Sequence, residues 1–473
     1  MSDLGTLRDR LTHVLETRSA ELKVAGAVVA VSVGGERVAV AHGSANLNTG
    51  QPFTTDTGFL LGSVTKVLVT TALLRLVERG AVDLDAPARR YVPEFTLADP
   101  DAAAAVTVRM LVNHTNGIDS DGLCPTPVRG RDASRSYTEH LPRMGVLFEP
   151  GTYLHYTNPG FVLAGRILEE QTGLPFELAI ERELFEPCGM ADATGVQTQA
   201  FLRRTAIGAY TDPETGALRA TPRFTLGESL AGGGSTLIVT VDDLMAFGRM
   251  HLSGGIAPNG ARVLSTEWVD AMRTPTFDLG LPQGPPMGLG WWLFPVAGTT
   301  APWHGGGSPN GVSSFGILPE HDAVIASFAT GGGRAVMNDL LHVAAVEELT
   351  GRSVTAPIDV TPTPAHDAVA GEYRAFQTRI VAEKDGDALV LTRHSEPYDE
   401  DHAAQSLAYA TGMTDPVPLP YRGVAPGQYA PADADESALG GFYGRMGLVA
   451  AVPADGARRA GLHTGFRYYP KTA

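Results

Sequence analysis

The sequence predicts an α+β chain in two parts, a larger part of helices and antiparallel strands followed by a small antiparallel β-barrel. The 473 residues exceed what one hydrophobic core usually serves, so two domains are expected. Helical patterns and hairpin-forming strand runs alternate through residues 1–353. A Pro/Thr-rich linker follows at 354–365, and residues 366–473 then show short strand-like runs separated by turns, as in a small barrel.

The larger part opens with an amphipathic, charged helix and continues into a hairpin. Residues 27–33 and 37–41 are β-rich runs separated by Gly34-Gly35-Glu36, a typical hairpin turn. The nearly continuous apolar run from Val67 to Val77 predicts a helix that is buried on most sides. Further helices are expected at 106–112, 161–172, 241–252 and 337–349, and strands at 288–294, 303–311, 313–318 and 323–330. In the smaller part, strands are expected at 371–374, 378–384, 388–393 and 440–447.

Composition excludes several classes of protein. With 52 acidic against 36 basic residues the net charge is −16, and no Lys/Arg cluster interrupts it, so nucleic acid and anionic membranes are poor partners. The N-terminal segment lacks the pattern of a secretory signal, and no uncharged apolar run could span a bilayer, so we expect a cytoplasmic protein. Cys124 and Cys188 have no partner spacing, which argues against a disulfide framework and structural zinc; we expect neither metal nor cofactor.

Ser63 and Lys66 form a Ser-x-x-Lys motif at the start of the buried helix. Positions i and i+3 share a helix face, so the hydroxyl and the amine would meet. Burial lowers the pKa of an ammonium group, which would let Lys66 act as a base towards Ser63. The N–H of Ser63, in the first turn, could bind a developing oxyanion. The same motif occurs by chance in many helices, so it requires partners from elsewhere in the chain.

Later segments supply candidate partners, and each has an ordinary structural interpretation as well. Tyr156 and Asn158 precede a helix, and buried tyrosines with satisfied hydroxyls are common. His304 could be a sheet histidine, although the three glycines after it leave room for a substrate backbone. His114 is most simply a turn residue that bonds backbone. The Gly-rich stretch 231–236 lacks the Walker lysine and the Rossmann spacing, so we interpret it as a tight turn against the cavity.

In chain order, Ser63-Val-Thr-Lys66, Tyr156-Thr-Asn158 and His304-Gly-Gly306 resemble the three motifs of the serine β-lactamase-like and penicillin-binding-protein superfamily. The branch is that of class C β-lactamases, D-amino-acid-specific peptidases and related esterases. Supporting stretches are Leu111–Gly117, Phe148–Gly151, Gly232–Thr236 and Gly288–Trp292, and the resemblance runs from the first helix to about Gly351. It implies a transpeptidase-like domain in which helices flank an antiparallel sheet, plus an all-helical region.

The resemblance also implies a role for each motif residue. Ser63 would be the acylated nucleophile, and Lys66 and Tyr156 would share the proton transfers. Tyr156 would return a proton to the leaving group if its pKa is depressed by the nearby amine. Asn158 would orient that amine. The N–H of Gly307 would complete an oxyanion hole with that of Ser63.

The third motif departs from the family pattern, which is usually Lys-Thr-Gly. A fixed ammonium is replaced by His304, whose ring can be neutral at pH 7, and this argues against classical β-lactams or free carboxylates as ligands. His304 could instead hydrogen-bond Tyr156. Gly305 and Gly306 are expected to contact the substrate.

Within the superfamily, the chain is most similar to the stand-alone penicillin-binding-protein-type thioesterases, the cyclases that release nonribosomal peptides such as surugamide. These proteins join a transpeptidase-like domain to a lipocalin-like barrel and act inside the cell. The resemblance implies that a peptidyl carrier protein delivers a peptide as a pantetheine thioester to Ser63. The peptide's own amine then releases a macrolactam, with a D-configured residue favoured at the acylated end. Such cyclases use a barrel arginine at the pocket; Arg445 is our candidate, and an exposed strand arginine is the alternative.

Cyclisation outcompetes hydrolysis only where water is excluded from the acyl-enzyme. Segment 125–143 is predicted to be a long loop or loosely helical insertion, and loops of that length often form lids that could exclude water. Two alternatives stay open. A D-aminopeptidase, D-stereospecific peptidase or esterase of the same fold would differ only in using water as the acceptor. A non-catalytic acyl-binding sensor would have no need for Ser63, Lys66 and Tyr156 together.

Overall fold

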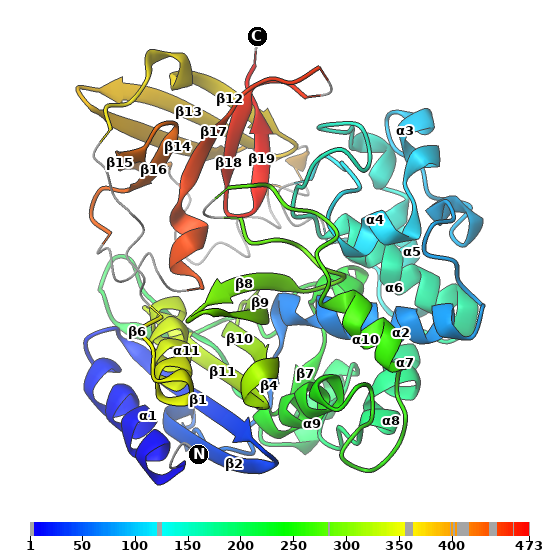
Figure 1. Ribbon diagram of the computed structural model, residues 1–473, viewed down its shortest axis with the longest axis vertical. Coiled ribbons are helices and arrows are strands. Elements are labelled where there is room, and N and C mark those ends of the chain that lie inside the picture. Colours follow the sequence, from blue (N-terminus) through cyan, green and yellow to red (C-terminus); the bar gives the residue numbers. More distant parts are fainter. Residues whose placement is uncertain are drawn as a thin grey trace.

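Two antiparallel sheets organise the chain, as a computed structural model shows for residues 4–120, 125–281, 284–354, 363–397, 399–400, 403, 416–434, 442–456 and 458–472 (Figure 1). The first is a seven-stranded sheet in the order β3-β2-β1-β11-β10-β9-β8, and the second is an eight-stranded sheet in the order β12 to β19. The α+β prediction is thereby confirmed. Figure 1 shows the barrel stacked on the side of the first sheet where β8 and β9 lie.

The seven-stranded sheet is assembled from the two ends of the larger part. The predicted hairpin is confirmed, because β1 pairs with β2 around a turn that places Val33 opposite Glu36. Strand β1 also pairs with β11, so N-terminal and late strands share the centre of the sheet. The strands are β1 (Val24–Val33), β2 (Glu36–Asn46), β3 (Gln51–Pro52), β8 (Trp292–Val296), β9 (Thr299–Ser308), β10 (Gly311–Leu318) and β11 (Ala323–Gly331). Two short pairs lie apart from it, β4 (Phe59–Leu60) with β7 (Ile238–Val239) and β5 (Ala209–Thr211) with β6 (Leu218–Ala220).

Helices cover both faces of this sheet. On one face α1 (Leu4–Arg18) and α11 (Arg334–Thr350) pack against each other and against the strands. Leu7, Leu11 and Leu15 are fully buried because their spacing of four residues puts them on one side of α1. On the other face lies α9 (Val241–Leu252), which begins at a capping box formed by Thr240 and Asp243.

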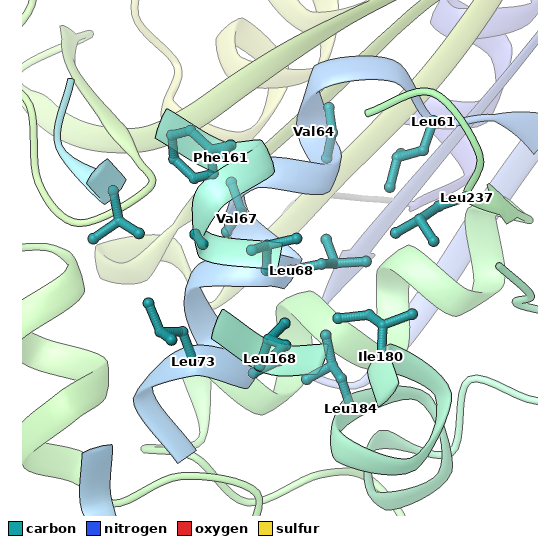
Figure 2. Close-up of a cluster of buried hydrophobic side chains, with 14 of the residues drawn as sticks. Leu61, Val64, Val67, Leu68, Leu73, Phe161, Leu168, Ile180, Leu184 and Leu237 are labelled. Carbon is teal, nitrogen blue, oxygen red and sulfur yellow. The ribbon is translucent and has the colours of Figure 1, made fainter. Parts of the chain in front are cut away.

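Helix α2 (Thr65–Glu78) runs through the main core, as its apolar run predicts. Figure 2 shows its side chains Val67, Leu68 and Leu73 near Phe161 and Leu168, and all five are buried. Burial on nearly every side explains why its apolar pattern lacks a polar stripe. The other helices are α3 (Pro100–Ala105), α4 (Val108–Val112), α5 (Ala133–Thr138), α6 (Pro159–Thr172), α7 (Phe176–Ile180), α8 (Glu186–Cys188) and α10 (Thr266–Met272), with 3-10 turns η1 (Gly62–Val64) and η7 (Glu228–Gly233) beside the site.

The second sheet is a nearly closed barrel in which each strand pairs with the next. Its ends approach each other where Tyr373 and Lys471 form a bridge between the first strand and the end of the last. Buried tyrosines at 373, 421, 429 and 469 fill its core. The strands are β12 (Gly371–Ala375), β13 (Thr378–Asp385), β14 (Ala388–Ser395), β15 (Pro418–Ala425), β16 (Gln428–Pro431), β17 (Val449–Val452), β18 (Gly461–Thr464) and β19 (Arg467–Pro470). The predicted barrel is confirmed.

Two local expectations need correction. Residues 444–447 were expected in a strand but form the 3-10 turn η10 (Gly444–Gly447), which in Figure 1 descends from the barrel towards β8. Segment 125–143 is less loop-like than expected, because its Tyr137 and Leu141 are buried in the main core and α5 packs against α6 and η7. Packing of apolar side chains, which a weakly periodic sequence does not reveal, holds this segment against the helical region.

Several sequence features fall partly outside the described residues. The linker boundaries at 354 and 365 remain predictions, since 355–362 lie outside that part of the chain, as does Cys124. Cys188 is a buried free thiol, and burial raises its pKa to about 12. In the described part of the chain, no helix combines the length and the hydropathy that crossing a membrane would require.

Candidate active site

Ser63 sits at the junction where η1 leads into α2. Gly62, just before it, adopts a left-handed φ of +61°, and a side chain there would collide with the backbone of Gly306 and Gly307. The turn therefore packs directly against β9. Ser63 is half-buried and lines a cavity of about 190 Å³, which gives its hydroxyl access to a ligand.

Lys66 is completely buried and points at Ser63. Its Nζ lies 3.2 Å from Ser63 Oγ, 2.9 Å from Asn158 Oδ1 and 2.6 Å from the carbonyl oxygen of Gly233. Burial lowers the pKa of Lys66 well below its ordinary value, and the charge of Arg467 lowers it further. A neutral amine in this position can accept the serine proton.

Tyr156 has its hydroxyl hydrogen-bonded to Ser63, and Lys66 Nζ lies 4.9 Å from the centre of its ring. The expected depression of the Tyr156 pKa is wrong. Burial raises the pKa to about 12, because desolvation of the phenolate outweighs the opposing effects of the Ser63 hydrogen bond and the Arg467 charge. The phenol therefore keeps its proton at neutral pH, whereas the lowered pKa of Lys66 favours a neutral amine.

His304 lies on β9 with a buried, neutral ring. Its Nδ1 is 2.6 Å from the carbonyl oxygen of Gly305, so this nitrogen carries the proton. Burial, together with the smaller effect of the neighbouring Lys66, lowers the pKa of His304 to about 3. Its Nε2 is buried and has no hydrogen-bond partner within the described residues, including Tyr156, whose ring centre is 6.3 Å away. The structure thus places a neutral ring where family members usually carry an ammonium.

The glycines after His304 do not all leave space for a substrate. A side chain at Gly305 would meet the hydroxyl of Tyr443, and one at Gly306 would meet Leu61 and Ser313. Only the third position, Gly307, faces open space. All three glycines still line the cavity through their backbone. The space predicted for a substrate at the first two positions is filled by protein, which sequence alone could not reveal.

His114 and the Gly-rich stretch 231–236 form the turns that the sequence suggests. His114 is a turn residue with a φ of +61°, and its Nδ1 accepts a hydrogen bond of 3.1 Å from the backbone N–H of Thr157. The Gly-rich stretch forms η7 and ends at Gly234 in a left-handed conformation. Gly233 and Gly234 line a second cavity of about 210 Å³ that also touches Ser63, Asn158, Leu226 and Leu230. The tight turn predicted against the cavity is therefore present.

Ser63 lies between these two cavities, and both are also lined by Tyr156, Gly307 and Arg467. The first cavity is walled by aromatic side chains, and the second by the Gly-rich turn and Asn158. A nucleophile with space on two sides can hold an acyl group on one side while a leaving group or acceptor occupies the other.

The barrel supplies one wall of the first cavity. The turn between β18 and β19 contributes Gly465, Phe466 and Arg467 to the lining. The backbone N–H of Tyr468 donates to His155 Nδ1 at 3.0 Å, and the Phe466 ring lies 4.2 Å from that of Trp292. These contacts join the hairpin to His155, next to the second motif, and to β8, so the site is built from both sheets.

Sequence reasoning selected a different arginine from the one in this wall. Arg445 lies on η10 with its guanidinium 5.8 Å from the centre of the Phe294 ring, and it does not line either cavity beside Ser63. Arg467 lines both, with its guanidinium 5.0 Å from the centre of the Tyr156 ring. Arg467, Tyr443, Phe466 and Trp292 were all missed. The available signal for Arg467 was the hairpin turn at Gly465, which gives no indication of what the turn touches.

No group of three or more His, Cys, Asp or Glu side chains that could hold a metal ion occurs among the residues described. The functional groups at Ser63 are an amine, a phenol, an amide, an imidazole and a guanidinium. This set can activate a hydroxyl, return a proton and stabilise an oxyanion, which are the requirements of acyl transfer through a serine.

A family model described as Beta-lactamase matches residues 11–349. The chain belongs to the beta-lactamase family. This confirms the superfamily inferred from the three motifs and makes the protein an enzyme that acts through a serine. It is 31% identical over 370 residues to penicillin-binding protein 4 of Amycolatopsis lactamdurans, a match that covers 75% of this chain and 94% of the relative.

Among solved structures, the fold of this beta-lactamase family member is similar to that of SurE over 99% of both chains, with a TM-score of 0.74 and 22% identity. SurE has also been solved with D-Leu. The D-amino acid amidase of Ochrobactrum anthropi SV3 matches with a TM-score of 0.61 and 24% identity, over 73% of this chain and 99% of the amidase. The fold match to SurE thus extends across the barrel, whereas the match to the amidase spans about three quarters of the chain.

Proposed function

We propose that this protein is a penicillin-binding-protein-type thioesterase that takes a peptidyl group from a carrier-protein thioester onto Ser63 and releases it by head-to-tail macrolactamisation. The observation that carries the proposal is the barrel hairpin, because Phe466 and Arg467 form a wall of the cavity at Ser63. Ring closure requires that water be kept from the acyl-enzyme, and an added domain that encloses the site serves that need. The fold shared with SurE along nearly the whole chain supports the same function.

In the acylation step, neutral Lys66 accepts the proton of Ser63, and Ser63 Oγ attacks the thioester carbonyl. In this proposal the N–H groups of Ser63 and Gly307 stabilise the negative charge that develops on the carbonyl oxygen, and the lining of one cavity by both residues supports it. The carbon–sulfur bond breaks as the tetrahedral intermediate collapses. The pantetheine thiol leaves with a proton from Tyr156, which is re-protonated from Lys66. The product is a peptidyl ester on Ser63.

In the release step, the peptide's N-terminal amine attacks the ester carbonyl. Its proton passes to Lys66, which is neutral again after acylation, and Ser63 Oγ leaves with a proton from Tyr156. Lys66 then gives the proton it gained to the Tyr156 phenolate, which restores both groups. The new amide bond closes the ring, and the serine hydroxyl is restored. His304 stays neutral throughout and contributes shape and an uncharged wall instead of a carboxylate-binding cation.

We propose that the acylated end of the substrate is a D-configured, apolar residue and that its side chain occupies the first cavity, which aromatic side chains line. Trp292, Trp303, Met446 and Phe466 provide an apolar lining in a space of about 190 Å³, which suits one medium-sized side chain. The structural neighbours include SurE solved with D-Leu and a D-amino acid amidase, which supports the same stereochemistry. Arg467 is placed to donate hydrogen bonds to carbonyl oxygens of the bound peptide.

The test is to offer a linear peptidyl pantetheine thioester with D-Leu at its activated end, next to the same peptide with L-Leu. We expect cyclic product from the D-peptide at a rate at least tenfold above that from the L-peptide, a discrimination of about 1.4 kcal/mol. Ser63→Ala should form no acyl-enzyme by mass spectrometry. Turnover by Ser63→Ala would remove the nucleophile, and water-added product alone from the D-peptide would overturn the cyclase.

The second candidate is a D-stereospecific peptidase, D-aminopeptidase or esterase, favoured by the fold match to the D-amino acid amidase. Only the acceptor differs, because water would replace the peptide amine. This enzyme would release linear acids from D-peptidyl esters and amides, and adding a free amine would not change the product. The ratio of cyclic to linear product therefore separates the two candidates.

A further inference from the structure

The hydroxyl of Tyr443 lies between β9, which carries the third motif, and the neighbouring strand β10. Gly306 on β9 and Ser313 on β10 are register partners in the seven-stranded sheet. The N–H of Gly306 donates to Tyr443 Oη at 3.1 Å, and the Tyr443 hydroxyl donates to the carbonyl of Ser313. A side chain from the barrel part of the chain thus bridges the paired residues Gly306 and Ser313 of the seven-stranded sheet.

The local sequence is adapted to this side chain. A Cβ atom at Gly305 would lie 2.5 Å from Tyr443 Oη, so only glycine accommodates the phenol there. The Tyr443 ring meets the Trp303 ring edge to face, at 5.3 Å and 85°. The first glycine after His304 therefore serves a contact within the protein.

Asp339 on α11 holds Tyr443 from the other side. Its Oδ1 accepts the backbone N–H of Tyr443 at 2.9 Å, and its Oδ2 accepts the same N–H at 3.0 Å and that of Gly444 at 3.0 Å. Burial raises the pKa of Asp339 to about 7, so these bonds gain the strength of charge-assisted contacts as the carboxyl group ionises through that pH. Tyr443 is thus attached at its backbone to α11 and at its hydroxyl to β9 and β10.

The pair of residues bridged by Tyr443 touches the nucleophile. A Cβ atom at Gly306 would lie 2.9 Å from the backbone nitrogen of Ser63, and one at Gly62 would lie 2.8 Å from the backbone nitrogen of Gly307. Strand β9 and the turn at Ser63 are thus in close backbone contact. A shift of β9 relative to β10 would change the separation of the Ser63 and Gly307 N–H groups.

We infer that Tyr443 is a positioning residue for acyl transfer, in which its hydroxyl sets the spacing of β9 and β10 and so holds the Gly307 N–H in register with Ser63. The inference rests on the proposed acylation of Ser63. It does not depend on whether an amine or water releases the acyl group. Asp339 acts through Tyr443 by fixing the start of η10.

The experiment compares Tyr443→Phe with Tyr373→Phe in the full-length protein. Tyr373→Phe is the control for loss of a buried tyrosine hydroxyl away from the site, since Tyr373 donates one hydrogen bond of 2.6 Å to the carbonyl of Val369 inside the barrel, whereas the Tyr443 hydroxyl makes two hydrogen bonds. The probe is a p-nitrophenyl ester of N-acetyl-D-leucine in single-turnover acylation of Ser63. We expect Tyr443→Phe to slow acylation by about 10-fold to 100-fold. This decrease does not exceed the decrease in rate that removal of one oxyanion-hole donor causes. KM should change little, and Tyr373→Phe should acylate like the wild type.

A D-leucine boronic acid supplies a readout that general loosening of the fold would not produce. The boronate places a negatively charged oxygen where the oxyanion forms, so its affinity should fall in Tyr443→Phe by the same factor as the acylation rate, while the affinity for N-acetyl-D-leucine amide is retained. Asp339→Asn should slow acylation less than Tyr443→Phe, and the double variant should be no slower than Tyr443→Phe alone.

The outcomes separate this inference from the proposed function. Wild-type acylation by the small ester together with failure to cyclise a peptidyl thioester would remove the cyclase and leave the role of Tyr443 standing. Acylation by Tyr443→Phe at the wild-type rate would overturn the inference. A fall in the rate with unchanged boronate affinity, or additive losses in the double variant, would overturn it as well.

Discussion

The backbone N–H of Tyr156 donates a hydrogen bond of 2.9 Å to the carbonyl oxygen of Phe466. Tyr156 belongs to the second catalytic motif, and Phe466 occupies the turn between two barrel strands, with a left-handed φ of +64°. This bond joins the residue that we propose as the proton donor directly to the barrel. The barrel is therefore part of the active site, and changes to it should affect chemistry as well as stability.

Phe466→Ala tests whether the wall that the barrel hairpin forms at the first cavity keeps water from Ser63. The Phe466 side chain is 3% exposed and packs on Trp292, so its removal should cost about 3 kcal/mol of unfolding free energy. It should also admit water and lower the ratio of cyclic to hydrolysed product, measured by liquid chromatography and mass spectrometry. Phe466→Leu, which keeps an apolar plug, should retain most of that ratio. An unchanged ratio in Phe466→Ala would show that this side chain does not exclude water.

The pH dependence of acylation should report Lys66. Because burial lowers the pKa of Lys66 well below 10.5, the amine loses its proton as pH rises through a value below the ordinary lysine range. Acylation should rise tenfold per pH unit below that value and then reach a plateau. Tyr156, with a pKa of about 12, stays protonated across the plateau. A rising limb centred at the ordinary lysine pKa, in stopped-flow acylation, would rule out a neutral base at rest.

Arg467→Met should move that rising limb. The charge of Arg467 lowers the pKa of Lys66, so removing it should raise this pKa and shift the limb to higher pH. Arg467→Lys keeps the charge and should keep the limb in place. Arg459→Met, an exposed arginine of the same barrel, is the control for net charge. Arg445→Met should move the limb less than Arg467→Met, and equal shifts would contradict the placement of Arg467 at the site.

Gly62→Ala and Gly80→Ala form a matched pair. Both positions have a left-handed φ, of +61° and +72°, so both should lose about 1 kcal/mol or more of stability. At Gly62 the new methyl group would also lie 2.7 Å from the carbonyl oxygen of Gly307, whereas at Gly80 it meets nothing within 4 Å. Gly62→Ala should therefore lower kcat by about 100-fold through displacement of β9, while Gly80→Ala keeps kcat. Equal kcat in the two variants would show that the contact does not position the oxyanion hole.

Much of the fold and part of the site could be predicted because the signals are local. The spacing of Ser63 and Lys66 predicted that their side chains would meet, and Nζ and Oγ are 3.2 Å apart. The apolar run after Lys66 predicted a helix buried on most sides, which α2 is. The hairpin at Gly34 and the short barrel strands were visible for the same reason, since turn chemistry and side-chain period are properties of neighbouring residues.

Two errors about the site have a common cause. The direction of the Tyr156 pKa shift depends on how completely the phenol is buried, and burial outweighs its neighbours. The choice of Arg445 over Arg467 depended on which barrel turn reaches the cavity. The residues next to Tyr156 do not reveal how deeply it is buried, and those next to Arg467 do not reveal that it reaches the cavity. Both features follow from how the barrel packs on the sheet.

The sequence by itself determined the order of helices and strands, the family, and the side chains available for chemistry. Only the tertiary structure decided that an amine from α2, a phenol before α6, an imidazole on β9 and a guanidinium on β19 surround one hydroxyl. It also decided that the glycine after His304 makes room for Tyr443 and not for a ligand. The physical reason is range: backbone periodicity and turn preference act over a few residues, whereas desolvation and contact depend on segments hundreds of positions apart.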